Sequence, residues 1–204
     1  MKRRRCDGYW RKAQKAGRAM SRRTLVFLGH PDQHSYCGAM AERAVEQALA
    51  KGDDVELLRL ADLHFSNPVP RRAEDDRRLE PDVARFQEAI RAADHLVFIF
   101  PIWWGGMPGR FKLLLELALT PGFAFQYIPN SIRWSRLLNG KTAELLVTMD
   151  TPPWFYRTIY RDAGISELRR NILDFCGVKV TRVRRFGSMR ISTEGQRQGW
   201  LAEL

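Results

Sequence analysis

Two short stretches combine residue types that suit the binding of a flat ring and of a phosphate. Pro101-Ile-Trp-Trp-Gly-Gly-Met-Pro108 places two tryptophans and two glycines directly after an apolar run. Aromatic rings offer a stacking surface, and glycines let backbone amides approach a ligand closely. His30-Pro-Asp-Gln-His-Ser-Tyr36 also follows an apolar run and leads into a helical pattern. The free N–H groups at a helix start favour phosphate, and His34 and Ser35 add donors.

A phosphate site beside an aromatic cleft lined with amides suits a flavin. The isoalloxazine would stack on the aromatic rings while backbone N–H groups bond its polar edge. Neither stretch contains G-x-G-x-x-G or G-x-x-x-x-G-K-[ST], which disfavours a Rossmann dinucleotide site and a P-loop. The sequence shows no catalytic triad and no metal-ligand spacing, so the cofactor would carry the chemistry. Packing and surface roles are the competing interpretation for His30, His34, Cys37, Phe123, Phe125 and Tyr127.

The elements that position these stretches alternate between strand and helix. Strands are expected over 24–29, 54–59, 96–101, 142–149 and 178–186, and helices over 37–51, from Pro81, over 108–119, over 166–176 and from Thr193. Five such alternations predict an α/β protein with a doubly wound parallel sheet, helices covering both faces. The count and spacing match a flavodoxin-like sheet of strand order 2-1-3-4-5. In that order the two stretches meet at the switch point between strands 1 and 3.

Three other segments carry weaker signals. Residues 60–80 form a polar connection with a charged cluster over 71–80, which we interpret as solvated. Residues 120–140 are long for a connection, and long loops inside compact domains are usually functional. The expected helix over 108–119 is apolar on nearly all sides, which predicts an interior or subunit-interface position.

Charge is concentrated at the N-terminus. Of the formal net charge of +11, residues 1–23 supply ten Lys or Arg against Asp7 alone, which leaves 24 basic and 22 acidic residues in 24–204. A near-neutral body disfavours a nucleic-acid-binding domain. We interpret residues 1–22 as a basic extension, disordered or weakly helical, and 23–204 as one domain. Met20 is an alternative start.

The extension has no apolar segment typical of a secretory signal, and no apolar run reaches membrane-spanning length. The three cysteines, Cys6, Cys37 and Cys176, are odd in number and widely spaced. Reduced thiols in a cytoplasmic protein fit that pattern.

Several motifs in order resemble the NAD(P)H:quinone oxidoreductase family, which includes ancillary oxidoreductases of potassium efflux systems. The resemblance rests on the stretches 28–36, 98–108, 111–112 and 121–125, and it covers about residues 24–190. It implies a flavodoxin-like homodimer with one flavin, FMN or FAD, per subunit at the interface. NAD(P)H would reduce the flavin by hydride transfer and leave, and a quinone-like acceptor would then take its place.

The resemblance also implies a set of site residues. The phosphate side of the flavin would meet His30, His34, Ser35, Tyr36, Cys37 and Ala39; the ring would lie along Pro101, Ile102, Trp103, Trp104 and Gly105; and Thr148, Met149 and Asp150 would lie at its other edge. The substrate would meet Trp104, Phe125, Tyr127, Trp154 and Tyr156. Of these, Phe125 and Tyr127 match positions that reach over the partner's flavin. By position alone, Tyr156 or Trp154 is the candidate for proton delivery.

The chain departs from the family pattern in three places. Pro152 and Pro153 stand where the family often has two glycines, and prolines donate no amide to the ring. Gly105 and Gly106 replace an aromatic residue, which predicts a roomier cleft. Cys37 stands where an Asn is expected.

A second hypothesis belongs to a different class: a flavin-binding accessory or redox-sensing subunit that docks on a transporter or another partner. A hydride donor would bleach the flavin fast in an enzyme, and slowly or not at all in such a subunit. A one-electron flavodoxin carrier is disfavoured, because such carriers are typically acidic.

Overall fold

The computed structural model describes residues 21–66 and 79–204; most of the basic extension, Cys6 and most of the charged cluster over 71–80 lie outside these residues. Five strands form one parallel sheet: β1 (Arg23–Leu28), β2 (Asp54–Arg59), β3 (His95–Pro101), β6 (Thr142–Thr148) and β7 (Lys179–Phe186). The longer helices are α1 (Tyr36–Ala50), α2 (Pro81–Ala92), α3 (Gly109–Ala118) and α6 (Glu194–Ala202). Shorter elements are η1 (Leu60–Asp62), α4 (Pro153–Thr158), α5 (Ala163–Ser166) and η3 (Met189–Ile191).

The order of the sheet is β2-β1-β3-β6-β7. Counting only the strands of this sheet, it is the predicted order 2-1-3-4-5, so the flavodoxin-like topology is confirmed. Every residue of the central strand β3 is buried, which explains its unbroken apolar run. The edge strand β2 is more polar, as the sequence predicted.

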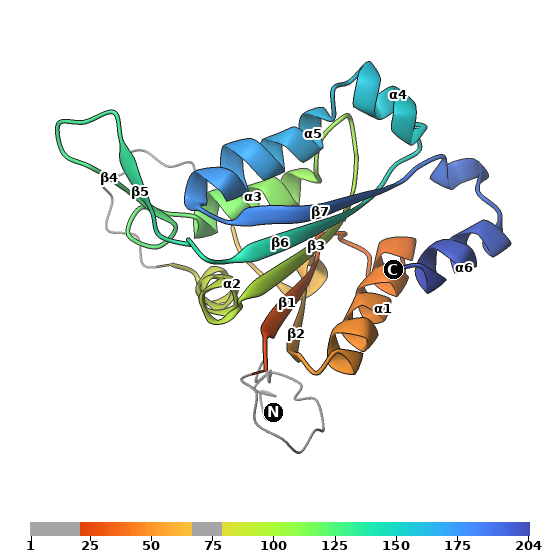
Figure 1. Cartoon of the computed structure of the whole chain (residues 1–204), viewed down its shortest axis with the longest axis horizontal. Helices are drawn as coiled ribbons and strands as arrows, with labels where there is room; N and C mark the ends of the chain where they lie inside the picture. Colours follow the sequence, from red (N-terminus) through yellow and green to blue (C-terminus); the bar gives the residue numbers. More distant parts are fainter. Residues whose placement is uncertain (1–20, 67–78) are drawn as a thin grey trace.

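Helices cover both faces of the sheet (Figure 1). On one face, α1 and α6 enclose a core that includes Val26, Met40 and Phe186. On the other, α2, α3 and the helix that starts at α5 enclose a larger core around Phe27, Phe98 and Phe111. Alternate residues of β1 therefore supply the two cores, because successive side chains of a strand point to opposite faces.

The predicted apolar helix is α3, one residue shorter than expected at each end, with Pro108 in the N-cap position. It buries Phe111, Leu114, Leu115 and Ala118, and Leu113 and Leu117 pack partly buried against the same core. The helix is thus placed mainly in the interior of the chain.

Two segments differ from the sequence expectation. Residues 120–140 are more than a loop, because β4 (Phe125–Tyr127) and β5 (Trp134–Arg136) pair as an antiparallel hairpin. The helix expected over 166–176 begins at Ala163 and turns π-helical over η2 (Glu167–Asp174). Both depend on contacts with a neighbour: the Trp134 ring stacks on Phe175, with ring centroids 4.5 Å apart.

Among the described residues, no helix has both the length and the apolar character needed to cross a bilayer.

The amino-terminal edge of the sheet holds a buried polar cluster. Asp53 accepts hydrogen bonds from the Arg22 guanidinium and from the Thr24 hydroxyl, the latter at 2.7 Å. On the next strand, His95 Nδ1 lies 2.8 Å from the Thr142 hydroxyl. Burial, helped by the nearby Arg22 charge, lowers the pKa of His95 to about 4.

This shift predicts a pH dependence of stability. Folded His95 stays neutral while the unfolded residue gains a proton below about pH 6.5, so the free energy of unfolding should fall as pH decreases from 6.5 toward 4. The variant His95→Gln keeps a polar partner for Thr142 but does not titrate. Urea unfolding from pH 4.5 to 7 should show a shallower decline for the variant. Equal slopes for both proteins would contradict this assignment.

Candidate functional site

The loops that follow β1, β3 and β6 meet at the carboxyl edge of the sheet, where they line a hollow of about 190 Å³. Its lining residues are His30, Ser35, Tyr36, Cys37, Pro101, Ile102, Trp103, Thr148, Met149, Asp150 and Met189. The hollow lies at the switch point between β1 and β3, where doubly wound sheets bind ligands. All but one of its residues belong to the set predicted from the sequence. The exception is Met189.

The first wall is the loop between β1 and α1, which is held by its own hydrogen bonds. Asp32 accepts from the His34 backbone amide at 2.8 Å, and its carbonyl accepts from the Ser35 hydroxyl at 2.7 Å. His30 Nδ1 accepts from the Asp32 amide at 2.9 Å. Ser35 then caps α1 by accepting from the Gly38 amide. The loop thus presents the N-terminus of a 15-residue helix at the hollow, a favourable place for an anion.

Gly38 is required by this loop, which sequence reasoning did not single out. A Cβ atom at position 38 would lie 1.8 Å from the Gln33 carbonyl oxygen. The first turn of α1 and the preceding loop therefore touch backbone to backbone, and no side chain fits between them. A glycine one residue after the predicted helix start was the available signal.

Two side chains of the first helical turn are engaged inside the protein. The Tyr36 hydroxyl donates to the Arg197 carbonyl at 2.8 Å and so ties α1 to α6. Cys37 Sγ lies 3.2 Å from the Thr148 hydroxyl at the end of β6. Burial raises the pKa of the Cys37 thiol to about 11, so it is neutral at physiological pH. Cys37 therefore joins two walls of the hollow as a packed thiol and not as a nucleophile.

The second wall is a tight turn over 103–106. The amide and carbonyl groups of Trp103 and Gly106 bond each other, at 2.8 and 3.0 Å. The two residues between them, Trp104 and Gly105, have φ of 50° and 82°. A left-handed tryptophan costs about 1–2 kcal/mol, so contacts elsewhere must hold it there. The Trp104 side chain is fully exposed, and among the described residues the amides of Trp104 and Gly105 have no hydrogen-bond partner.

Those contacts come from behind the turn. The Tyr156 hydroxyl donates to the Gly105 carbonyl at 2.8 Å and accepts from the Gly164 amide at 2.9 Å. A Cβ on Gly164 would lie 2.7 Å from the Gly106 Cα atom, so the start of α5 packs directly against the turn. Tyr156 is 1 % exposed, and burial raises the pKa of its hydroxyl. Its place in the structure is that of a positioning residue for the turn, behind the hollow.

The third wall joins the ends of β6 and β7. The Met149 amide donates to the Phe186 carbonyl at 2.8 Å, and the Met189 amide donates to the Met149 carbonyl at 3.2 Å. The Asp150 carboxylate accepts from the Arg190 amide at 2.9 Å. The bond from the Met189 amide to the Met149 carbonyl places Met189 at the site. Its position just beyond the fifth strand was the only sequence signal for it.

Several predicted site residues lie outside the hollow. The side chains of His34, Ala39, Trp104 and Trp154 are exposed, and neither Trp104 nor Gly105 lines the hollow. Phe125 and Tyr127 lie on the β4–β5 hairpin, where Phe125 packs on Phe175 near the opposite, amino-terminal edge of the sheet (Figure 1). One chain therefore does not bring these two aromatic residues to the hollow. Their assignment to a partner's flavin remains a prediction.

The walls fit the two ends of a flavin. The helix N-terminus at Ser35 suits the phosphate, and the unpaired amides of Trp104 and Gly105 offer donors for the ring. His30 packs edge-on against Trp103 with ring centroids 5.4 Å apart, and burial lowers the pKa of His30. A neutral imidazole and a neutral thiol therefore line the hollow. Among the described residues, no three His, Cys, Asp or Glu side chains gather as a metal site.

Comparison with known proteins gives the same fold and points to redox enzymes. The family described as having the flavodoxin-like fold matches residues 22–204. The human ribosyldihydronicotinamide dehydrogenase [quinone] is 27% identical over 212 residues, covering 89% of this chain and 88% of that protein. The NAD(P)H dehydrogenase [quinone] 1 of Cavia porcellus is 29% identical over 186 residues, covering 79% and 67%. The solved structure of a putative quinone reductase from Klebsiella pneumoniae superposes with a TM-score of 0.75 at 25% identity, covering 89% and 82%.

Removing the Tyr156 hydroxyl should loosen the turn. In Tyr156→Phe the Gly105 carbonyl and the Gly164 amide lose their partner, which should lower the free energy of unfolding by about 1–3 kcal/mol. The matched control is Tyr160→Phe, because the Tyr160 side chain is half exposed. Urea unfolding and hydrogen exchange of the amides over 103–106 measure the effect. If both variants match the unmodified protein, Tyr156 does not hold the turn.

Proposed function

This chain belongs to the family of proteins with the flavodoxin-like fold, and from its site we propose that it is a flavin-dependent NAD(P)H:quinone oxidoreductase. One observation carries the proposal: the N-terminus of α1, which can bind a phosphate, lies near the turn over 103–106, in which the amides of Trp104 and Gly105 have no hydrogen-bond partner among the described residues. Both lie at the carboxyl edge of the sheet, where this fold binds ligands. Two relatives are named NAD(P)H dehydrogenase [quinone] 1 and ribosyldihydronicotinamide dehydrogenase [quinone], and these names suggest a reduced nicotinamide as donor and a quinone as acceptor.

A bound flavin would supply two-electron chemistry between NAD(P)H and a quinone. The donor and the acceptor would occupy the same site in turn. The protein would bind and orient the cofactor and exclude water from it. The N-terminus of α1 and Ser35 would hold the phosphate, and the amides of Trp104 and Gly105 would donate to the ring edge.

The rigidity of the turn sets the position of the ring. Tyr156 and Gly164 support the turn from behind, so the amides of Trp104 and Gly105 would be held in place before a ligand binds. Such preorganisation lowers the entropic cost of binding. Asp150 is held by the Arg190 amide at the opposite wall, so its carboxylate is oriented as well.

We propose further that the active form is a homodimer. The hollow of one chain, about 190 Å³, is smaller than the 300–1,000 Å³ typical of small-molecule sites, so a partner would complete it. The hairpin exposes large apolar side chains at Tyr127, Ile128, Ile132 and Leu137. Exposed apolar groups of this kind mark protein interfaces. In the dimer, Phe125 and Tyr127 would reach the partner's flavin.

We propose a cytoplasmic location, because Cys37 and Cys176 are both free thiols, which fits a reducing compartment.

Absorption spectroscopy tests the cofactor and the two half-reactions. The purified protein should show a flavin band that NADPH bleaches without oxygen and that a quinone restores. Gly38→Ala should lose the flavin, because its Cβ would meet the Gln33 carbonyl oxygen, whereas Gly199→Ala, with no atom near the new Cβ, should keep it. A flavin band that NADPH leaves unchanged would favour an accessory or sensing subunit. Full flavin retention in a folded Gly38→Ala protein would place the phosphate elsewhere.

Subunit mixing tests whether Tyr127 acts across the dimer. Tyr127→Ala alone should lower kcat/KM for the quinone about tenfold through loss of an aromatic contact. A heterodimer of one Tyr127→Ala chain and one Gly38→Ala chain holds one flavin, which is faced by the intact Tyr127 of the other chain. Its activity should therefore return to about half that of the unmodified dimer.

The control for this mixing experiment replaces Tyr127→Ala with Gln126→Ala, because the exposed Gln126 side chain points to the opposite face of β4 and its loss should not affect kcat/KM. Activity that stays low in the mixed dimer would mean that Tyr127 serves its own chain. Sedimentation that shows only monomers would contradict the dimer itself.

A further inference from the structure

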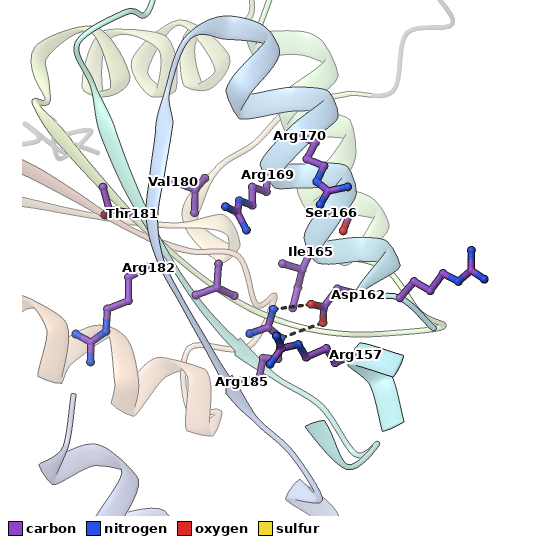
Figure 2. A pocket seen from close by; sticks show the side chains of 12 residues that line it. Arg157, Asp162, Ile165, Ser166, Arg169, Arg170, Val180, Thr181, Arg182 and Arg185 are labelled. Carbon is purple, nitrogen blue, oxygen red and sulfur yellow. Dashed lines mark hydrogen bonds and ion pairs between the residues drawn. The ribbon is translucent and has the colours of Figure 1, made fainter. Parts of the chain in front are cut away.

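A second, larger hollow lies away from the site just described, between the helix that starts at α5 and the edge strand β7 (Figure 2). Its volume is about 580 Å³. The residues that line it are Arg157, Arg161, Asp162, Ile165, Ser166, Arg169, Arg170, Val180, Thr181, Arg182, Val183 and Arg185. We call it the arginine groove. Six of its residues are arginines and one is acidic.

Three of the arginines face one another across the groove. Figure 2 shows Arg169 reaching from the helix toward β7, and Arg157 and Arg185 converging near Asp162. Arg170 and Arg182 point away from this centre and form the rim. The three inner guanidinium groups come from α4, the π-helical segment and β7. Tertiary folding therefore gathers them from positions that are well separated in the sequence.

Most of the arginines that line the groove have no carboxylate partner among the described residues. Asp162 accepts from Arg185 through both carboxylate oxygens, at 2.9 and 2.6 Å, so its charge is already used. Arg182 Nε lies 3.3 Å from Glu144 Oε1. Within residues 21–66 and 79–204, no carboxylate lies within ion-pair distance of Arg157, Arg161, Arg169 or Arg170. Residues 153–204 hold ten basic and five acidic residues, so the excess is local to this end of the chain.

The backbone at the head of the groove is also unusual. Arg161 and Asp162 are consecutive non-glycine residues with φ of 52° and 53°, in the left-handed region. Such a pair persists only where neighbouring contacts hold it. Here the paired Arg185 and Asp162, together with the bond from the Asp162 amide to the Tyr156 carbonyl at 3.1 Å, fix the geometry. These contacts fix the backbone at the head of the groove and the position of the Arg185 guanidinium.

The shape and chemistry select one class of ligand. Guanidinium groups match phosphate oxygens in a bidentate geometry. No aromatic side chain lines the groove, so it offers no surface on which nucleic-acid bases would stack. A membrane surface is flat, whereas this site is concave and its volume suits a small molecule.

We propose that the arginine groove binds a compact polyphosphate ligand, one with two or more adjacent phosphates, at a site separate from the flavin and its donor. Arg157 and Arg169 would contact the phosphate oxygens, and the Ser166 hydroxyl would donate to one of them. Arg185 would stay with Asp162 and keep the groove in shape. Neutralising the clustered charge would stabilise the folded protein through binding.

The probe for the test is inorganic tripolyphosphate, measured by calorimetry and by thermal unfolding on the full chain. It should bind and raise Tm, whereas sodium chloride at equal ionic strength should not. Arg169→Gln should weaken binding about tenfold or more, because a charge-assisted contact is lost. Arg133→Gln, which removes the same charge from an exposed position on the β4–β5 connection, should leave the affinity unchanged. Neither residue has a carboxylate partner among the described residues, so both variants should fold.

Four results would overturn the proposal. The first is a rise in Tm with chloride equal to that with tripolyphosphate, which would reduce the effect to screening. The second is an equal loss of affinity in Arg169→Gln and Arg133→Gln. The third is Arg169-dependent binding of a short single-stranded oligonucleotide or of anionic vesicles that tripolyphosphate does not displace. The fourth is a tripolyphosphate-dependent rise in the KM for NADPH in the unmodified protein and not in Arg169→Gln, which would make the groove part of the donor site. Loss of the proposed enzyme activity would leave the first three measurements interpretable.

Discussion

The burial of β3 constrains everything else in this structure. All seven of its residues are buried, and it pairs in parallel with β1 on one side and β6 on the other. A strand without an exposed side must have helices on both faces, so the chain has to alternate between strand and helix. Parallel pairing also brings the carboxyl ends of three strands to one edge. The loops after Leu28, Pro101 and Thr148 meet there as a consequence.

Given that convergence, the site is made by close backbone contacts more than by reactive side chains. Gly38 and Gly164 each lie where a methyl group would collide with another backbone segment. Tyr156 bridges two such segments with a single hydroxyl. The result is a set of fixed amides and a helix start, with neutral His30 and Cys37 beside them. Such a site binds and orients, and leaves the redox chemistry to a cofactor.

The distribution of charged residues in the fold differs from their distribution along the sequence. Taken over residues 24–204, 24 basic and 22 acidic residues nearly balance. That average conceals the C-terminal part, where η2 and β7 place arginines from separate segments around one groove. Only Asp162 balances them at the centre. An even composition is therefore compatible with a strong local field, because folding, and not sequence proximity, decides which charges are neighbours.

The sequence by itself determined the alternation of elements and the order of the five-stranded sheet, because a buried strand and an amphipathic helix leave periodic signals and strand order places particular loops together. Through its resemblance to a known family, the sequence also implied ten of the eleven residues that line the hollow. It did not determine the β4–β5 hairpin, the π-helical segment, the role of Gly38 or the buried position of Tyr156. Those depend on contacts between distant segments, such as Phe175 with Trp134 or Gly164 with Gly106, which no local pattern encodes. The arginine groove belongs to this second group, since its charges meet only when the helix packs beside β7.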